Sequence, residues 1–302
     1  FEVEIILSDI SKNLNFLFNL ENVKVSYLPY QLNLWNKFYL LAKIFNNSFK
    51  KIYILAPKNF YFYLPLFLNS KFYAITIKNS ERSRPFKFLL NKLFKYIVND
   101  RDNKKMNQSI NSLIFNLCST KSKSSYSNYL SQNPQTSKLF NDNINLFSNF
   151  IHIHYKDFIF KKNGWNEEKF FKLIKNLSLT YKILLTSDFG QSEYHKKFLS
   201  NFSHLDFKNC TNKINPTSNI HYLHNIEMND VFKLISLSNT VISPHGAMTV
   251  LASYLKKKVI DIFDSNIDIN AFREYKPCNK NYNFFIIKPN FDKILFKIKY
   301  FL

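Results

Sequence analysis

Glycine and cysteine are both scarce in this sequence. Only three of its 302 residues are glycine, so each position where one stands is informative. The three cysteines, Cys118, Cys210 and Cys278, lie far apart and form no CxxC pair. An odd, sparse set argues against a disulfide framework and against a structural zinc site. We therefore expect a reducing compartment, the cytoplasm.

Long apolar runs are also missing. No run approaches the roughly 18 uninterrupted apolar residues that a membrane-spanning helix needs, and no cleavable signal segment is apparent. The sequence therefore predicts a protein that is soluble or peripheral to the inner face of the membrane. The chain begins at Phe1 rather than Met, which is typical of a fragment or of a trimmed chain.

Acidic residues are too few to balance the basic ones. There are 42 Lys and Arg against 21 Asp and Glu, a net charge of +21. Such a charge favours a polyanion or an anionic membrane surface as a neighbour. The alternative is compositional, because Lys, Asn, Ile, Phe and Tyr are all abundant, as A+T-biased codons would produce. The 46% hydrophobic and 18% aromatic content excludes a disordered chain.

The length predicts two domains of about 150 residues each. In the first half, strand-like and helix-like runs alternate, which indicates a parallel sheet covered by helices. The expected strands are 24–28, 51–56 and 71–77, and the expected helices are 32–44, 61–68 and 86–98. The last helix could lie on a membrane surface, although covering a core is the more common role for such a pattern. A Ser-, Asn- and Lys-rich stretch, 119–143, predicts a boundary near its end, giving domains 1–145 and 146–302.

The second half repeats the alternation more clearly and predicts a doubly wound α/β domain. Its expected strands are 150–154, 182–187, 220–223, 240–243 and 258–263. Its expected helices are 165–177, 191–200, 229–236, 247–255 and 291–302. Asn163 is the expected N-cap of the first of these helices.

One glycine lies where a strand meets a helix, in the run VISPHGAMTV. Val241–Ser243 reads as a buried strand that Pro244 cannot continue. Gly246 lets the backbone turn sharply and approach a ligand. The helix that starts at Ala247 then presents free N–H groups, a site suited to phosphate. The alternative is a plain tight turn.

This run resembles the carboxy-terminal signature of glycosyltransferase family 9, the heptosyltransferase-like enzymes. The matching positions are Ser243, Pro244, Gly246, Ala247 and Met248. Upstream, a strand containing His152 and His154, a basic loop and Trp165 at a helix start also look like that family, so the resemblance covers about 115 residues. His245 departs from the usual Asp, Thr249 stands near the usual His, and the family's opening Gly-Asp loop is not found. His-Gly-Ala also occurs after a strand in family 61 glycosyltransferases.

The resemblance implies the GT-B architecture, two Rossmann-like domains facing a cleft, with the acceptor on the first and the donor on the second. It implies transfer of a sugar from a nucleotide diphosphate to a glycan or glycolipid, in surface polysaccharide or lipopolysaccharide assembly. No cofactor or metal is expected, because no acidic DxD pair is convincingly placed. Protein groups would then meet the charge of the diphosphate. The candidates are the N–H groups of Ala247 and Met248, the Thr249 hydroxyl, Lys161 and Lys162.

The remaining candidates have alternatives of equal or greater weight. His245 could donate to the diphosphate or the sugar, or be a loop histidine satisfied by backbone. Ser187 and Asp188 could reach the donor, although capping a helix is the commoner role. Glu227 and Met228 stand where the family contacts the nucleotide, or in an ordinary loop.

Three further readings remain. His152 and His154 alternate along one strand and so share a face, which favours core or cleft lining over metal binding. A basic nucleic-acid-binding protein is the alternative from another class, although no recognition element is apparent and no nucleic acid is expected. The loss of Asp at His245 and of the Gly-Asp loop also suits a catalytically inactive scaffold that binds glycan.

Overall fold

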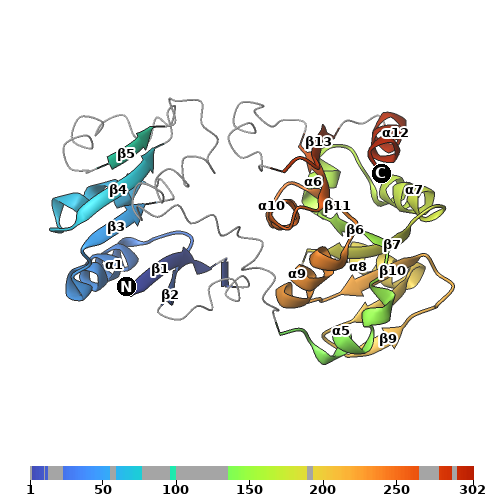
Figure 1. Cartoon of the computed structure of the whole chain (residues 1–302), viewed down its shortest axis with the longest axis horizontal. Coiled ribbons are helices and arrows are strands. Elements are labelled where there is room, and N and C mark those ends of the chain that lie inside the picture. Colours follow the sequence, from blue (N-terminus) through green and yellow to red (C-terminus); the bar gives the residue numbers. More distant parts are fainter. Residues whose placement is uncertain are drawn as a thin grey trace. The chain divides into compact units, whose positions relative to one another are not determined.

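The structure is a computed structural model, and it describes residues 2–9, 11–12, 23–54, 59–76, 96–99, 135–188, 193–264, 279–287 and 291–302. The chain forms two compact units (Figure 1). Unit 1 comprises Phe1–Lys123 with Asp268–Lys276, and unit 2 comprises Ser124–Ile267 with Pro277–Leu302. Helix α5 (Lys138–Asp142) thus belongs to unit 2.

Unit 1 contains the parallel strands that the sequence predicts. Its elements are β1 (Val3–Ser8), β2 (Val23–Leu28), α1 (Leu34–Asn47), β3 (Lys51–Ile54), β4 (Lys71–Thr76) and β5 (Tyr96–Asn99). β1 pairs with β2, and β3, β4 and β5 form a second parallel sheet in that order. Leu40 and Ile44 of α1 are buried with Leu28, Ile54 and Phe72 in a small core.

Two segments of unit 1 differ from the predicted helices. Residues Asn59–Leu66 form the 3-10 helix η2, where an α-helix was expected at 61–68. Pro65 explains the difference, because proline has no N–H and its ring clashes with the preceding turn of an α-helix. Residues 96–98, predicted as the end of a helix, belong to β5, and their aromatic and β-branched side chains suit a strand. Residues 86–95 of that predicted helix lie outside the described residues.

Unit 2 is built on one eight-stranded sheet in the order β13-β12-β11-β6-β7-β10-β8-β9. Five strands were predicted: β6 (Phe150–Tyr155), β7 (Lys182–Ser187), β10 (Ile220–His224), β11 (Thr240–Pro244) and β12 (Lys258–Phe263). Three were not: β8 (Ser203–Asp206), β9 (Thr211–Lys213) and β13 (Tyr282–Ile286). All neighbours pair in parallel except β8 and β9, which pair antiparallel at one edge. The doubly wound parallel domain is therefore confirmed.

Seven α-helices are described in unit 2. They are α5, α6 (Asp157–Lys162), α7 (Glu167–Ser178), α8 (Glu193–Asn201), α9 (Met228–Leu237), α10 (Ala247–Tyr254) and α12 (Phe291–Phe301). The N-cap of α7 is Asn166, whose side chain accepts the Lys169 N–H at 3.0 Å. The predicted cap, Asn163, instead follows the end of α6. Among the described residues, no helix combines the length and the apolar composition needed to cross a bilayer.

The two faces of the unit 2 sheet have different chemistry. Alternate residues of β6, Ile151, Ile153 and Tyr155, enter an apolar cluster with side chains of α7, α8 and α12. The residues between them, His152 and His154, point to the opposite face because side chains alternate along a strand. Both histidines are buried, so this second face carries polar groups inside the fold.

Candidate functional site

The carboxyl ends of β6 and β11 mark a topological switch point. The chain leaves β6 for β7 on one side and returns, after β10, to β11 on the other side. β11 pairs with β6 only over Thr240–Ile242 but with β12 as far as Pro244. Open α/β sheets bind ligands where neighbouring strands part in this way.

Pro244 belongs to its strand, whereas the sequence predicted that it could not continue it. It is the last residue of β11, and the next N–H, that of His245, donates to the carbonyl of Ile262 at 3.0 Å. Because pairing with β6 has already stopped at Ile242, the missing N–H of the proline breaks no bond of the ladder.

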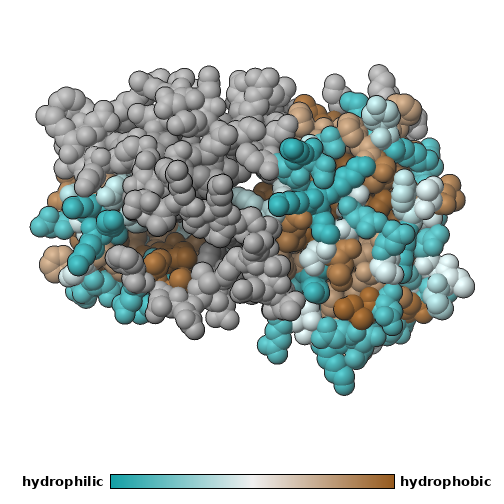
Figure 2. Space-filling model, viewed as in Figure 1, coloured by the Kyte–Doolittle hydropathy of each residue, from teal (hydrophilic) through white to brown (hydrophobic). Residues whose placement is uncertain are grey.

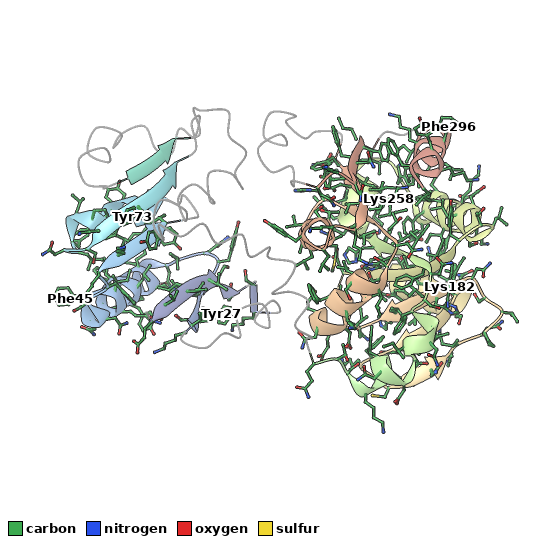
Figure 3. All side chains as sticks on the ribbon, in the orientation of Figure 1. Tyr27, Phe45, Tyr73, Lys182, Lys258 and Phe296 are labelled. Atoms are coloured by element: carbon green, nitrogen blue, oxygen red, sulfur yellow. The ribbon has the colours of Figure 1, made fainter. Side chains whose placement is uncertain are left out.

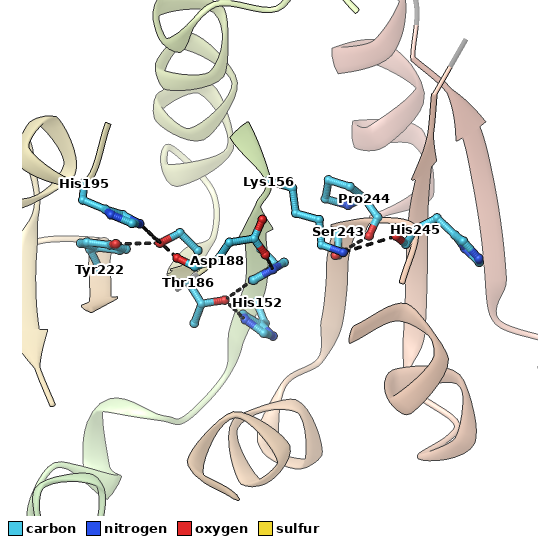
Figure 4. A network of polar contacts seen from close by, with 11 residues as sticks. His152, Lys156, Thr186, Asp188, His195, Tyr222, Ser243, Pro244 and His245 are labelled. Carbon is cyan, nitrogen blue, oxygen red and sulfur yellow. Dashed lines mark hydrogen bonds and ion pairs between the residues drawn. The ribbon is translucent and has the colours of Figure 1, made fainter. Parts of the chain in front are cut away.

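Lys156 occupies this switch point (Figure 4). It directly follows β6, and its Nζ lies 3.4 Å from the carbonyl oxygen of His245. A Cβ built on Gly246 would lie 2.6 Å from that Nζ. Gly246 therefore leaves the space in which the ammonium group sits, and its φ of +156° is a backbone conformation that residues with a side chain rarely adopt.

The turn into α10 places backbone N–H groups, which carry partial positive charge, beside Lys156. The Gly246 N–H donates to the Thr249 hydroxyl at 3.3 Å, and that hydroxyl donates to the Gly246 carbonyl at 3.0 Å. The N–H groups of Ala247 and Met248 find no acceptor within the described part of the chain. The buried Thr249 hydroxyl is thus used by the turn itself, whereas the two N–H groups of the first helical turn are orphan donors among the described residues.

Asp188 stands at the end of the adjacent strand, β7, and heads a chain of buried polar groups. Its Oδ1 lies 3.3 Å from Nε2 of His154. Nδ1 of His154 lies 2.9 Å from the Thr186 hydroxyl, which lies 2.8 Å from Nε2 of His152 (Figure 4). Nδ1 of His152 is buried with no hydrogen-bond partner among the described residues.

The protonation states in this chain follow from burial. Burial lowers the pKa of His152 to about 3 and lowers that of His154, although its bond to Asp188 opposes the shift. Burial would raise the pKa of Asp188, but the hydrogen bond from His154 and the charge of Lys156 hold it below its usual value. Asp188 is thus a carboxylate beside a cation. If His154 donates Nε2–H to it, Thr186 donates to His154 and accepts from His152.

His245 contributes its carbonyl, not its ring, to the switch point. Its Nδ1 lies 2.7 Å from the carboxylate of Asp261, and its ring stacks on Phe263 with 4.4 Å between centroids. The ring points away from Lys156 (Figure 4). The Tyr282 hydroxyl donates to the same oxygen of Asp261. Burial, and then the charge of Asp261, raise the pKa of this tyrosine. These contacts hold the loop so that its carbonyl meets the lysine.

The two predicted lysines of α6 have acidic partners elsewhere. Lys161 Nζ lies 2.9 Å from Asp157, one turn earlier in the same helix. Lys162 Nζ lies 2.5 Å from Asp264, which follows β12. Both therefore lie at the carboxyl edge of the sheet, but neither is placed at the switch point as Lys156 is.

The predicted serines are engaged within the fold. The Ser243 hydroxyl is buried and donates to the Pro244 carbonyl at 2.8 Å. The Ser187 oxygen lies 2.7 Å from the Tyr222 hydroxyl and 3.0 Å from Nε2 of His195. Both serines support strand ends instead of offering a free hydroxyl.

Glu227 and Met228 begin α9, just after β10. Glu227 is exposed and its side chain makes no cap hydrogen bond. β10 is separated from β11 by β7 and β6, so these residues share the carboxyl edge but lie on the other side of the switch point.

Metal ligation is not indicated by the described side chains. Within the parts of the chain that the structure describes, no three His, Cys, Asp or Glu residues gather closely enough to hold an ion. The cationic Lys156 and the N–H groups of α10 are instead suited to an anion.

Sequence reasoning missed Lys156, the pairing of His154 with Asp188, and the bond between His245 and Asp261. One feature of the sequence could have indicated Lys156, because it is the first residue after the first strand of the unit. In a doubly wound sheet that position lies at the ligand-binding edge.

No protein-family model matches the chain, and no curated protein sequence matches it. Several solved structures match the chain. The Escherichia coli heptosyltransferase WaaC with ADP is 10% identical, with 100% of both chains covered and a TM-score of 0.62. The chain has the GT-B fold. A family 9 glycosyltransferase from Veillonella parvula is 11% identical, with 99% of this chain and 80% of that chain covered and a TM-score of 0.59.

The GT-B fold is also shared with nucleotide-sugar epimerases. The UDP-GlcNAc 2-epimerase from Methanocaldococcus jannaschii is 12% identical, with 98% of this chain and 83% of that chain covered and a TM-score of 0.58. The fold class expected from the VISPHGAMTV run is thus confirmed, and the structural neighbours include glycosyltransferases and a UDP-GlcNAc 2-epimerase.

Proposed function

We propose that this chain binds a nucleotide diphosphate sugar at the switch point of unit 2 and transfers the sugar to a hydroxyl of a glycan or glycolipid. The observation that carries the proposal is Lys156 seated over Gly246, at the beginning of α10. A GT-B neighbour has been solved with ADP and with ADP-2-deoxy-2-fluoro heptose, which supports a nucleotide-sugar donor.

The charges of the site suit a diphosphate leaving group. Negative charge develops on the diphosphate as its bond to the sugar breaks. In our proposal the N–H groups of Ala247 and Met248 and the ammonium of Lys156 meet that charge without a metal ion. Lys161 and Lys162 stand one helix away and add to the local positive potential.

Asp188 takes a different role in this proposal. A carboxylate repels phosphate but accepts hydrogen bonds from hydroxyl groups. We place Asp188, held by His154, against a hydroxyl of the nucleotide ribose or of the sugar. His245 is a positioning residue, because its bond to Asp261 and its stacking on Phe263 fix the loop. The acceptor and its pathway, surface polysaccharide or lipopolysaccharide assembly, follow from the family resemblance.

The proposal is tested first by binding. Thermal unfolding of the full chain is followed with ADP, UDP and GDP and with their sugar derivatives. We expect at least one nucleoside diphosphate to raise Tm. Lys156→Met should weaken the affinity for that ligand by about 10- to 100-fold, which corresponds to the loss of one charge-assisted hydrogen bond. Lys175→Met, an exposed lysine on α7, is the matched control and should bind normally.

Two results would contradict the site. Either no nucleoside diphosphate raises Tm, or the Lys156 and Lys175 variants lose affinity equally. Turnover then separates the activities that GT-B proteins carry. Acceptor-dependent release of nucleoside diphosphate supports transfer, and a changed sugar in the recovered donor shows an epimerase. Binding without turnover shows an inactive scaffold.

A further inference from the structure

The outer face of α1, in unit 1, is apolar. Leu34, Trp35, Phe38, Tyr39 and Phe45 are 65%, 81%, 56%, 60% and 70% exposed. We call this surface of four aromatic residues and one leucine the aromatic face of α1. The residues of the helix that are buried, Leu40 and Ile44, lie on its other side. This helix thus has apolar side chains on both faces.

The exposed sector of α1 contains no charged residue. At 3.6 residues per turn, the aromatic face covers about 140° of the helix circumference, and Ala42 and Asn46 also fall within it. Lys37 and Lys43 lie beyond its two borders. Lys43 is fixed there by an ion pair with Glu4, and Lys37 lies 5.6 Å from the centroid of the Phe60 ring.

This arrangement is unusual for the outer face of a helix in a folded domain. Such a helix normally turns charged and polar residues outward. Single exposed apolar residues are common, but a contiguous set of large ones marks an interaction surface. Figure 3 labels Phe45 on this helix, and Figure 2 shows brown, hydrophobic atoms exposed in the ungreyed part of unit 1.

The charge of the chain identifies the kind of partner. A net charge of +21 makes two copies repel each other, and it attracts an anionic surface. Helices that lie in a bilayer interface turn a face of large apolar side chains toward the lipid. Trp35 and Tyr39 suit the same place, because aromatic side chains with a polar group favour the headgroup region. We propose that the aromatic face of α1 lies in the headgroup region of an anionic lipid bilayer.

The fluorescence of the chain's own tryptophans can report this contact. It has two tryptophans, Trp35 and Trp165, which are 81% and 1% exposed. The full chain is titrated with vesicles of phosphatidylcholine alone and with vesicles that also contain phosphatidylglycerol. We expect the anionic vesicles to shift Trp35 emission to the blue and to protect it from acrylamide. Trp35→Phe should abolish both signals, because the emission of Trp165 is already that of a buried ring.

A pair of double variants tests the surface itself. Phe38→Ser with Phe45→Ser removes two rings from the aromatic face and keeps Trp35. Phe296→Ser with Tyr300→Ser removes two rings of α12, in unit 2, that are 70% and 78% exposed. Binding to the anionic vesicles, measured by co-sedimentation, should weaken by about tenfold or more in the first variant and stay unchanged in the second. Added salt should weaken binding of the unchanged chain.

Three results would overturn the proposal. The unchanged chain could fail to bind anionic vesicles, or the two double variants could lose binding equally. Protection of Trp35 that rises with protein concentration in the absence of lipid would instead show that a second copy covers the face. The melting temperature of each variant, measured beside the unchanged chain, shows that a loss of binding is not a loss of folding. None of these measurements uses a nucleotide, so they stand apart from the proposed activity.

Discussion

The core of unit 2 and helix α1 of unit 1 use aromatic side chains in opposite ways. In unit 2, Tyr155, Phe170 and Phe198 are fully buried and pack against one another, with ring centroids 4.4 to 6.0 Å apart. In unit 1, Trp35 and Phe38 of α1 face outward. The same residue type therefore builds a scaffold in one unit and a surface in the other.

Polar residues show the reverse pattern. Unit 2 takes His152 and His154 into its interior, where the Thr186 hydroxyl bridges them. Buried polar groups are costly unless they are hydrogen-bonded, so this chain of contacts is a constraint on the fold as well as a support for Asp188. In our proposals, unit 2 therefore holds the nucleotide-sugar site, and unit 1 offers the surface that meets a bilayer.

The strongest test of this difference is one substitution made in both units. Phe198→Ala removes a ring that is fully buried between α8 and the sheet, and it should lower the free energy of unfolding by about 3–5 kcal/mol. Phe38→Ala removes an exposed ring and should change the free energy of unfolding by about 0.5 kcal/mol or less. Urea unfolding followed by circular dichroism measures both. Similar losses for the two variants would show that α1 packs against a further part of the chain.

The buried histidines make unit 2 sensitive to acid. Burial lowers the pKa of His152 to about 3 and that of His221 to about 4. Between these values and the ordinary value of about 6.5, the unfolded chain binds protons that the folded chain does not. The free energy of unfolding should therefore fall as the pH drops from about 6.5 towards 4, by up to about 1.4 kcal/mol per pH unit for each histidine.

His152→Gln tests the assignment of this acid sensitivity. Glutamine retains an N–H donor for Thr186 but does not titrate. The slope of unfolding free energy against pH should then be shallower by about one proton between pH 4 and 6, whatever the absolute stability of the variant. An unchanged slope in urea titrations would assign the acid sensitivity to other groups.

The sequence predicted the central strands of unit 2 because each contains β-branched, leucine or aromatic residues within a short run. β8 and β9 were missed because they are short and polar; β9 consists of Thr211, Asn212 and Lys213, all exposed. Their place in the sheet comes from pairing with β10 and with each other, which no local pattern encodes. The 3-10 helix η2 was predicted as a helix because of its apolar content. The sequence pattern gave the wrong helix type, because a single proline decides it.

The candidate site was predicted where its chemistry is local and missed where it depends on topology. Gly246 and the first turn of α10 follow one another in the chain, so a local pattern was enough to suggest an anion site, with a plain tight turn as the alternative. Lys156 is one of 42 basic residues, and nothing beside it in the sequence distinguishes it. Its position has meaning only because β11 lies next to β6, a neighbour 85 or more residues away. The same holds for His154 with Asp188 and for His245 with Asp261.

A smaller predicted loss of stability concerns an interaction that both units share. Asn33 caps α1 by accepting the Asn36 N–H at 2.8 Å, and Asn166 caps α7 through the N–H of Lys169 at 3.0 Å. Each substitution by alanine should cost about 1 kcal/mol. If the two units unfold separately, the first variant shifts only the transition of unit 1 and the second only that of unit 2, as differential scanning calorimetry would show. A single transition that moves equally in both variants would mean that unit 1 and unit 2 unfold as one. The contrast between them would then be one of surface chemistry rather than of stability.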